Sequence, residues 1–359
     1  MTDFDIAQRR LHNQSIAPAA SMTPGDVVKR LGAVQAQDYL GALWAIGLRL
    51  KTATGQTIEQ AIRDRQIIRT WPMRGTLHFV AAEDARWMLA LLTPRIMAGS
   101  ATRHKQLELD ETTFGRAETL FAASLRGGRR LTRPEMMAVL EQGGIATAGQ
   151  RGYHVLWWAA QSGLICFGPR QGKQDTFVLL DDWLPAGKTL SREESLAELA
   201  RRYFSGHGPA TLQDFRWWSG LTAAEARAGL ETVAARLAHE TLDGQTYWFS
   251  PSLPPAPAAS PTAYLLPGFD EYLLGYKDRR AVLDPAHAAR VVPGGNGMFK
   301  PIIIIDGRVV GAWQRTRRKT KVVVTLEPFE PLSLAQMEAA AAAAEPYGRF
   351  LGLPVEISR

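Results

Sequence analysis

The stretch QRGYHVLWWAAQSGLICFGPRQGKQDTFVLLDDW, residues 150–183, contains the pattern that decides the fold. Its first part has apolar residues at helical spacing, and the run closes at Gly163, since glycine commonly follows the last residue of a helix. Its second part reads as two alternating apolar strands around a tip rich in Gly, Gln, Lys and Arg. This second part predicts a β-hairpin.

Two further helices are expected immediately before this stretch. FGRAETLFAASLRGG and RPEMMAVLEQGG each show helical periodicity and each end in a glycine pair. Three short helices followed by a β-hairpin predict a winged helix, a helix-turn-helix variant whose third helix and hairpin contact DNA.

The same unit occurs three times along the chain. Thr23, Thr132 and Thr211 are each followed three residues later by an acidic residue, and each therefore can cap the start of a helix. In the first copy we expect helices near 23–36, 39–50 and 57–65, followed by the hairpin IIRTWPMRGTLHFVA. In the third copy the helices are SREESLAELARRYFSG, TLQDFRWWSGLT and AAEARAGLETVAARL, and the hairpin is LAHETLDGQTYWFS.

The period of the apolar pattern changes after the third copy. PSLPPAPAASPT contains five prolines and predicts a stiff, extended linker. Beyond it AYLLPGFDEYLLGYKDR, KPIIIIDGRVVGAWQRTRRKTKVVVTLEP and PVEIS read as strands, with a hairpin turn at IDG and an alanine-rich helix, SLAQMEAAAAAAEPYGRFLG, near the end. The predicted fold class is therefore α+β, with three tandem winged helices followed by a small β-rich C-terminal domain. The expected ranges are 1–105, 106–188 and 189–250 for the winged helices, 251–262 for the linker and 263–359 for the last domain.

Composition favours a folded, DNA-associated protein of the cytoplasm. The 359 residues carry a net charge of +7, which fits either an acidic partner such as nucleic acid or a merely basic surface. The single cysteine, Cys166, excludes an internal disulfide and fits a reducing compartment. The N-terminus has no apolar signal core, and no long uncharged apolar run follows. We expect a cytoplasmic, nucleoid-associated monomer.

No cofactor or metal is expected. The seven histidines are scattered without helical ligand spacing, and no Cys-x-x-Cys pair exists.

Positive charge concentrates in QRTRRKTK. On a strand, alternation would place Trp313 on one face with four cations, Arg315, Arg317, Lys319 and Lys321. Like charges on one face repel each other unless an anion lies along them, which favours contact of Arg315, Arg317 and Lys319 with DNA phosphates. The alternative is an edge strand charged to prevent aggregation.

The predicted wings supply further candidates for DNA contact. In the first hairpin these are Arg69, Arg74 at the tip, and His78, although His78 can equally be a histidine packed on the sheet. In the middle copy, Arg151 opens the third helix together with His154, and Lys173 lies at the wing tip.

Gln35 and Gln37 lie in the apolar run LGAVQAQDYLGALWAIGLRL. On a regular helix their side chains would point about 200° apart. Asp38 is a natural N-cap for the helix that follows, so QAQ is expected in the turn between two helices, with both carboxamides on one side. A carboxamide cannot titrate, but it can hold a water molecule and stabilise a developing cation. This suits the loss of an N7- or N3-alkylated purine, which already carries positive charge.

These motifs resemble the AlkZ-like bacterial DNA glycosylases. LGAVQAQD is similar to the family's Gln-Φ-Gln motif, with Ala36 at Φ. IIRTWPMRGTLHFV is similar to its first wing, and LLPGFDEYLLGYKDR and FKPIIIIDGRVVGAWQR are similar to its C-terminal signatures. The resemblance implies tandem winged helices, duplex DNA with alkylated bases as partner, and excision of alkylated purines or unhooking of interstrand crosslinks. It also implies that Gln35 and Gln37 bind and orient the attacking water. Because no lysine adjoins the motif, we expect a monofunctional enzyme that leaves an abasic site.

Two other functions fit parts of the sequence. A non-catalytic winged-helix protein or transcription regulator would use the same DNA-binding units, but it would have no use for a glutamine pair. A nuclease would need a carboxylate cluster for Mg²⁺, and Asp270-Glu271 is the only concentration of acid worth noting. We expect that pair to form hydrogen bonds and ion pairs that join the C-terminal domain to a winged helix.

Overall fold

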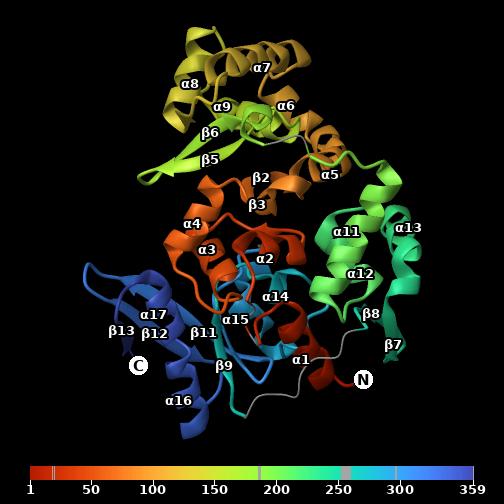
Figure 1. Cartoon of the computed structure of the whole chain (residues 1–359), viewed down its shortest axis with the longest axis vertical. Helices are drawn as coiled ribbons and strands as arrows, with labels where there is room; N and C mark the ends of the chain where they lie inside the picture. The colour runs from red at the N-terminus through yellow and green to blue at the C-terminus, as the bar shows by residue number, and fades with distance from the viewer. Residues whose placement is uncertain (18, 20, 185–186, 252–259, 296, 359) are drawn as a thin grey trace. The chain divides into compact units, whose positions relative to one another are not determined.

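The computed structural model describes residues 1–17, 19, 21–184, 187–251, 260–295 and 297–358. Figure 1 labels most of its helices and strands. Contacts divide the chain into two compact units, one formed by residues 1–58 with 196–359 and the other by residues 59–195. None of the helices in the described ranges combines the length and the apolar character needed to span a bilayer. The domain boundaries expected at residues 105, 188 and 250 were placed from the repeated units of the sequence, and they remain predictions.

The first unit begins with helices that the capping signals define. They are α1 (Asp3–Asn13), α2 (Pro24–Leu31) and α3 (Tyr39–Gly47), with the two-residue strand β1 (Val34–Gln35) between the last two. The helix α4 (Gly55–Arg63) runs across the boundary with the second unit. The helix expected over 23–36 ends at Leu31 because Gly32 has φ of 76°, a left-handed conformation that favours glycine and terminates helices.

The third copy folds as three helices and a hairpin. The helices are α11 (Arg192–His207), α12 (Leu212–Ser219) and α13 (Ala223–Val233), followed by the 3₁₀ turn η2 (Ala234–Arg236). The hairpin consists of β7 (Ala238–Leu242) and β8 (Gln245–Phe249). The Thr211 hydroxyl accepts the Asp214 N–H, and Asp214 accepts the Thr211 N–H, so the predicted capping box of α12 is confirmed.

The C-terminal sheet has the order β13-β12-β11-β10-β9. Its strands are β9 (Ala263–Leu266), β10 (Ile302–Ile305), β11 (Arg308–Arg317), β12 (Val322–Pro328) and β13 (Val355–Ser358). The predicted turn at IDG is confirmed, since Asp306 and Gly307 both have positive φ, 49° and 86°, between paired strands. Most of the proline-rich segment expected as a linker, residues 252–259, lies outside the described residues.

Two expectations for the C-terminal region were wrong in part. The segment after Leu266 is not a strand but contains the short helices α14 (Glu271–Leu274) and α15 (Ala288–Val291), with the 3₁₀ turns η3 (Pro285–His287) and η4 (Pro293–Gly295). The alanine-rich helix is two helices, α16 (Leu334–Ala342) and α17 (Glu345–Leu351). Pro346 lies in the first turn of α17, where its missing N–H costs nothing, whereas inside one continuous helix it would remove a hydrogen bond.

One hydrophobic core of the first unit joins its N-terminal helix to its C-terminal sheet. Ile6 and Leu11 of α1 are buried in the same cluster as Leu266, Ile302 and Tyr272. Segments at opposite ends of the sequence therefore fold together.

The second unit contains the hairpin of the first copy and the whole middle copy. Its helices are α5 (Ala85–Gly99), preceded by η1 (Ala82–Asp84), α6 (Ala101–Gln106), α7 (Glu111–Leu125), α8 (Arg133–Gln142), α9 (Arg151–Gln161) and α10 (Leu180–Trp183). Its strands are β2 (Ile67–Met73), β3 (Thr76–Ala81), β4 (Leu131–Thr132), β5 (Ile165–Gln171) and β6 (Gln174–Leu179).

The two predicted wings of this unit form one sheet. Within the unit the strand order is β3-β2-β5-β6-β4, and β2 meets β5 through the pair Arg69 and Phe167. Figure 1 shows α7, α8 and α9 beside β5 and β6, as expected for three helices packed on a hairpin. The observed fold is α+β, as predicted.

Candidate active site

The Gln35–Gln37 turn lies between two helices, as predicted. After Gly32 ends α2, the backbone is extended through β1, and Asp38 begins α3 with φ of −86° and ψ of 97°. The Asp38 carboxylate accepts the Gly41 N–H at 3.1 Å, which satisfies a free donor of the first helical turn. The two glutamines therefore do not lie on one continuous helix.

The two carboxamides lie on the same side of the turn and bond to each other. Gln35 Nε2 donates to Gln37 Oε1 at 2.5 Å, and the Gln37 N–H donates to Gln35 Oε1 at 3.3 Å. Gln35 is buried and Gln37 is exposed, with Ala36 fully buried between them. The buried amide thus fixes the orientation of the exposed one, and each oxygen keeps a second lone pair for another donor.

A buried carboxylate supports the turn from within the first unit. Glu271, the first residue of α14, is 1 % exposed, and its Oε1 accepts the Gln35 N–H at 3.3 Å. Its Oε2 accepts Trp218 Nε1–H at 2.9 Å and lies 3.2 Å from His207 Nε2. Burying a carboxylate is costly unless it is hydrogen bonded, and here three groups from three segments converge on it.

The neighbouring acid anchors the other end of α3. Asp270 and Arg49 form a buried, bidentate ion pair, with Nη2 at 2.8 Å from Oδ1 and Nη1 at 2.9 Å from Oδ2. Arg49 also donates to Gln14 Oε1 and to the carbonyl of Ala45. The hydrogen bonds and ion pairs predicted for Asp270-Glu271 are therefore present, and they reach residues of both the first and the third copy. Among the described residues, no group of three His, Cys, Asp or Glu side chains could hold a metal ion.

The C-terminal sheet also holds the start of α3. Arg315 of β11 donates through Nη2 to the Asp38 carboxylate at 3.0 Å. Trp44 of α3 donates Nε1–H to the Leu265 carbonyl at 2.9 Å and meets the rings of Tyr347 and Phe350. The glutamine turn is thus fixed at both ends by residues far away in the sequence.

The expected row of four cations on one strand face was wrong in part. β11 ends at Arg317, and the chain turns at 318–321, where the Arg318 N–H donates to the Lys321 carbonyl at 2.9 Å. Lys319 and Lys321 therefore do not continue the face of Arg315, and Lys321 pairs with Glu356. The edge-strand alternative was wrong as well, because β11 lies between β10 and β12. Arg317, Arg318 and Lys319 form an exposed basic cluster, the β11–β12 tip.

In the first hairpin, two of the three candidates for DNA contact are buried. Arg69 is 6 % exposed, and its guanidinium pairs with Asp175 at 3.0 Å and lies over the Phe167 ring. His78 is fully buried with Nδ1 at 2.9 Å from the Thr76 carbonyl, as in the packed alternative. A buried side chain does not reach a phosphate. The expectation that Arg69 and His78 contact DNA is therefore replaced by a structural role for both residues. Arg74 is partly exposed at the hairpin turn, where its φ is 53°.

The candidates of the middle copy differ in their surroundings. Arg151 donates to the carbonyls of Ala146 and Glu108 at 3.0 Å, and also to that of Leu107, so it ties together the loops around α9. His154 is partly exposed and lies beside the His104 ring. Lys173 is exposed at the β5–β6 turn, as expected for a wing tip.

Sequence reasoning missed the supports of the glutamine turn. The sequence predicted that Asp270-Glu271 joins the C-terminal domain to a winged helix, but not that Glu271 accepts the N–H of Gln35, 236 positions away. Trp218 and His207 carried no separate signal, because a tryptophan and a histidine near helix ends are ordinarily core residues.

Comparison with known proteins agrees with this architecture. The family model "DNA glycosylase AlkZ-like" matches residues 28–350. The "Interstrand DNA cross-link repair glycosylase" of Streptomyces sahachiroi is 28 % identical over 371 aligned positions, which cover 97 % of each chain. The solved structure of Streptomyces sahachiroi DNA glycosylase AlkZ superposes with a TM-score of 0.80 at 26 % identity and covers 100 % of both chains. The chain described here therefore belongs to the AlkZ-like family of DNA glycosylases.

Proposed function

We propose that this DNA glycosylase excises N-alkylated, positively charged purines by directing one water molecule at the sugar with Gln35 and Gln37. The observation that carries the proposal is the direct bond between the two carboxamides in the turn between α2 and α3. An exposed amide whose orientation is fixed by a buried one is preorganised for a polar ligand. Preorganised dipoles are worth more at a reacting centre than mobile ones.

The chemistry follows from the charge of the leaving base. When the C1′–N bond breaks, its electron pair neutralises the cationic purine, so the base leaves without being protonated. The sugar becomes an oxocarbenium-like cation, and the oxygen of water forms the new bond at C1′ and releases a proton to solvent. An amide oxygen that accepts a hydrogen bond from this water fixes its direction, and the negative end of the amide dipole favours the developing positive charge.

The product is expected to be an abasic site in an intact strand. Covalent catalysis and strand cleavage need an amine nucleophile, and an amide side chain is not one. The closest lysines in the sequence, Lys29 and Lys51, stand outside the Gln-Ala-Gln motif. We therefore assign the chain to the monofunctional class.

Duplex binding is assigned to cations that are exposed or partly exposed at turns. In the first unit these are Arg317 and Lys319 of the β11–β12 tip, and in the second unit Arg74 and Lys173 at hairpin turns. Arg315 is bonded to Asp38, so its main effect is expected on the glutamine turn. The Streptomyces relative is named for interstrand crosslink repair, and a crosslinked purine alkylated at N7 carries the same positive charge. We include such crosslinks among the proposed substrates.

Excision assays on matched duplexes test this function. One duplex carries a single N7-methylguanine, and the other carries hypoxanthine, a neutral purine, at the same position. We expect alkali-labile breaks only with N7-methylguanine, no breaks without alkali, and no covalent adduct after borohydride treatment. Equal release of hypoxanthine would contradict the dependence on positive charge. A borohydride-trapped adduct would contradict the monofunctional assignment.

A further inference from the structure

The second unit carries a group of cations between the end of α7 and the start of α8. Four of the eight residues at positions 126–133, RGGRRLTR, are arginine, and none is acidic. We call residues 126–133 the arginine segment, and its cations are Arg126, Arg129, Arg130 and Arg133. All four are exposed, and none of their side chains has a hydrogen bond or an ion pair with another described residue. Like charges so close together repel one another, and an anionic partner would remove that repulsion.

Two acids hold the backbone of the arginine segment in place. Asp182 accepts the N–H groups of Gly127 and Gly128 at 2.9 and 3.3 Å. Both glycines have positive φ, 78° and 75°, a conformation that glycine adopts without strain. Glu135 accepts the N–H and the hydroxyl of Thr132 at 2.7 and 2.6 Å, in the capping box of α8. These acids bond to the backbone and to the cap, so the segment is fixed while its guanidinium groups remain open to a partner.

Strand pairing brings the arginine segment toward the β5–β6 turn. β4 is antiparallel to β6, so the chain runs along β4 in the direction of that turn. The last residue of β4, Thr132, lies opposite Thr176, and Arg133 follows it. Arg133 therefore leaves the sheet at the end where the turn presents the exposed Lys173. The acid of this hairpin, Asp175, is already paired with two arginines of β2 and β5.

Arg130 is laid along the same hairpin. A β-carbon placed on Gly168 of β5 would lie 3.7 Å from Cδ of Arg130, which is ordinary van der Waals contact. The stem of Arg130 therefore packs across β5 and β6, while the residue as a whole stays exposed, since a long side chain can bury its stem and keep its charge in water. Binding an anion then costs less conformational entropy than ordering a fully mobile arginine would.

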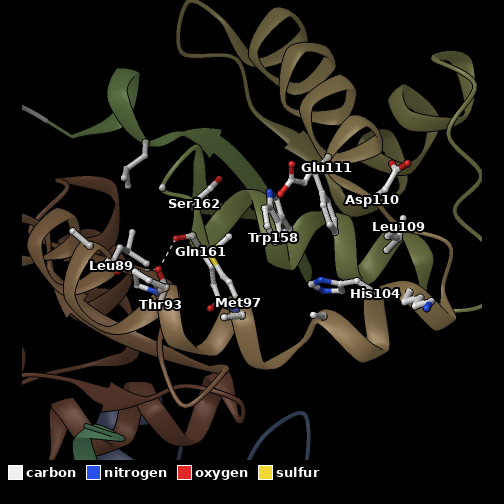
Figure 2. A pocket seen from close by; sticks show the side chains of 18 of the residues that line it. Leu89, Thr93, Met97, His104, Leu109, Asp110, Glu111, Trp158, Gln161 and Ser162 are labelled. Carbon is white, nitrogen blue, oxygen red and sulfur yellow. Dashed lines mark hydrogen bonds between the residues drawn. The ribbon is translucent and has the colours of Figure 1, made fainter. Parts of the chain in front are cut away.

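The helix that a winged-helix unit ordinarily presents to DNA offers little surface here. α9, the third helix of the middle copy, is described in full; seven of its eleven residues are buried, and Tyr153 is its one exposed residue. Its later turns pack against α5 and α6 (Figure 2). The Thr93 hydroxyl donates to the Gln161 carbonyl at 2.9 Å, and the His104 ring is edge-on to Trp158. The exposed charge of this copy therefore lies outside α9.

We propose that the second unit binds the sugar–phosphate backbone of duplex DNA through the arginine segment and Lys173. This rests on the proposed function only for the identity of the partner, duplex DNA. Guanidinium groups are always charged, and they can pair with a phosphate through two parallel hydrogen bonds. Phosphates carry no base sequence, so this contact serves duplexes of any sequence, as an enzyme that acts on scattered lesions needs.

The salt dependence of binding to an undamaged, fluorescently labelled duplex tests the proposal on the full chain. We expect Arg129→Gln/Arg133→Gln to decrease the slope of log affinity against log salt by about 2, since each phosphate contact contributes about 0.9. Between about 50 and 200 mM salt the wild type should then lose about tenfold more affinity than this variant. Adding Lys173→Gln should decrease the slope by about one more.

The matched control is Lys105→Gln/Lys188→Gln, which removes the same charge from two exposed positions of the same unit outside the arginine segment. We expect this control to keep the wild-type slope. A wild-type slope in R129Q/R133Q, or an equal decrease in K105Q/K188Q, would overturn the proposal. Because the duplex is undamaged, the result does not depend on catalysis by Gln35 and Gln37. Absence of excision with the expected change in slope would contradict only the proposed function, and an unchanged slope with excision retained would contradict only the arginine segment.

Discussion

The backbone N–H of Gln35 donates to the buried carboxylate of Glu271 at 3.3 Å. This bond connects the proposed catalytic turn to α14 and, through the same carboxylate, to Trp218 and His207. Glu271 therefore acts as a positioning residue, because it contacts the backbone of the turn and not its carboxamides.

Glu271→Gln should slow excision without weakening DNA binding. The neutral amide has one acceptor where the carboxylate has two, so its NH₂ group must face a donor. We expect the single-turnover rate to fall by about tenfold, equivalent to about 1.4 kcal/mol. The rate and the affinity for undamaged duplex should be measured together below the melting temperature. A variant that loses DNA affinity and keeps its single-turnover rate would contradict the positioning role.

The Arg49–Asp270 pair should dominate the stability of the first unit. Both side chains are almost fully buried, so Arg49→Met leaves an uncompensated carboxylate and is expected to cost about 3–5 kcal/mol. The double variant Arg49→Met/Asp270→Leu should recover much of that loss, because no buried charge remains. Urea denaturation of both variants measures the difference. An additive, larger loss in the double variant would contradict this account.

Glu198 should make stability depend on pH at the acidic end. Burial alone would raise the pKa of Glu198, but hydrogen bonds from Arg201 and Arg202 and their charges lower it from 4.5 to about 2. A lowered folded-state pKa contributes stability above pH 4.5 that is lost as pH falls toward 2. Glu198→Gln should therefore be less stable than the wild type at neutral pH, and the two should converge near pH 2. Thermal melts across that range test the sign, and a constant difference would contradict it.

The β11–β12 tip should set part of the salt dependence of DNA binding. Replacing Arg317, Arg318 and Lys319 by serine removes three exposed cations. If each contacts a phosphate, the slope of log affinity against log salt should decrease by about 2 to 3. Gln314→Ser, an uncharged change at an exposed position of β11, is the control. An unchanged slope in the triple variant would remove these residues from the interface.

Local signals in the sequence predicted most of the elements. Capping pairs such as Thr23 with Asp26 mark true helix starts, and the sign of φ at Gly32 and Asp306 explains where the chain turns. Asp38 as an N-cap correctly predicted that Gln35 and Gln37 lie outside a helix. These features depend on a few neighbouring residues, so they can be recognised without the fold.

Long-range contacts could not be predicted in the same way. The pairing of Arg69 with Phe167 joins two wings into one sheet, and nothing in either hairpin indicates its partner. The predicted basic strand was too long. The alternation of side chains along a strand does not reveal that the chain turns after Arg317. Glu271 was expected to bond to a winged helix, but nothing in the sequence indicated that the backbone of the glutamine turn is its partner.

Gln35 and Gln37 are proposed to act together on one water molecule. The most direct measurement is the single-turnover excision rate of N7-methylguanine by Gln35→Ala, Gln37→Ala and the control Gln142→Ala, each with its affinity for undamaged duplex. We expect the first two variants to lose about 100- to 1,000-fold in rate, the range for removing one preorganised dipole, and to keep their affinity. We also expect a double variant scarcely slower than either single one, since the amides act as a unit. Wild-type rates in Q35A and Q37A would contradict the claim.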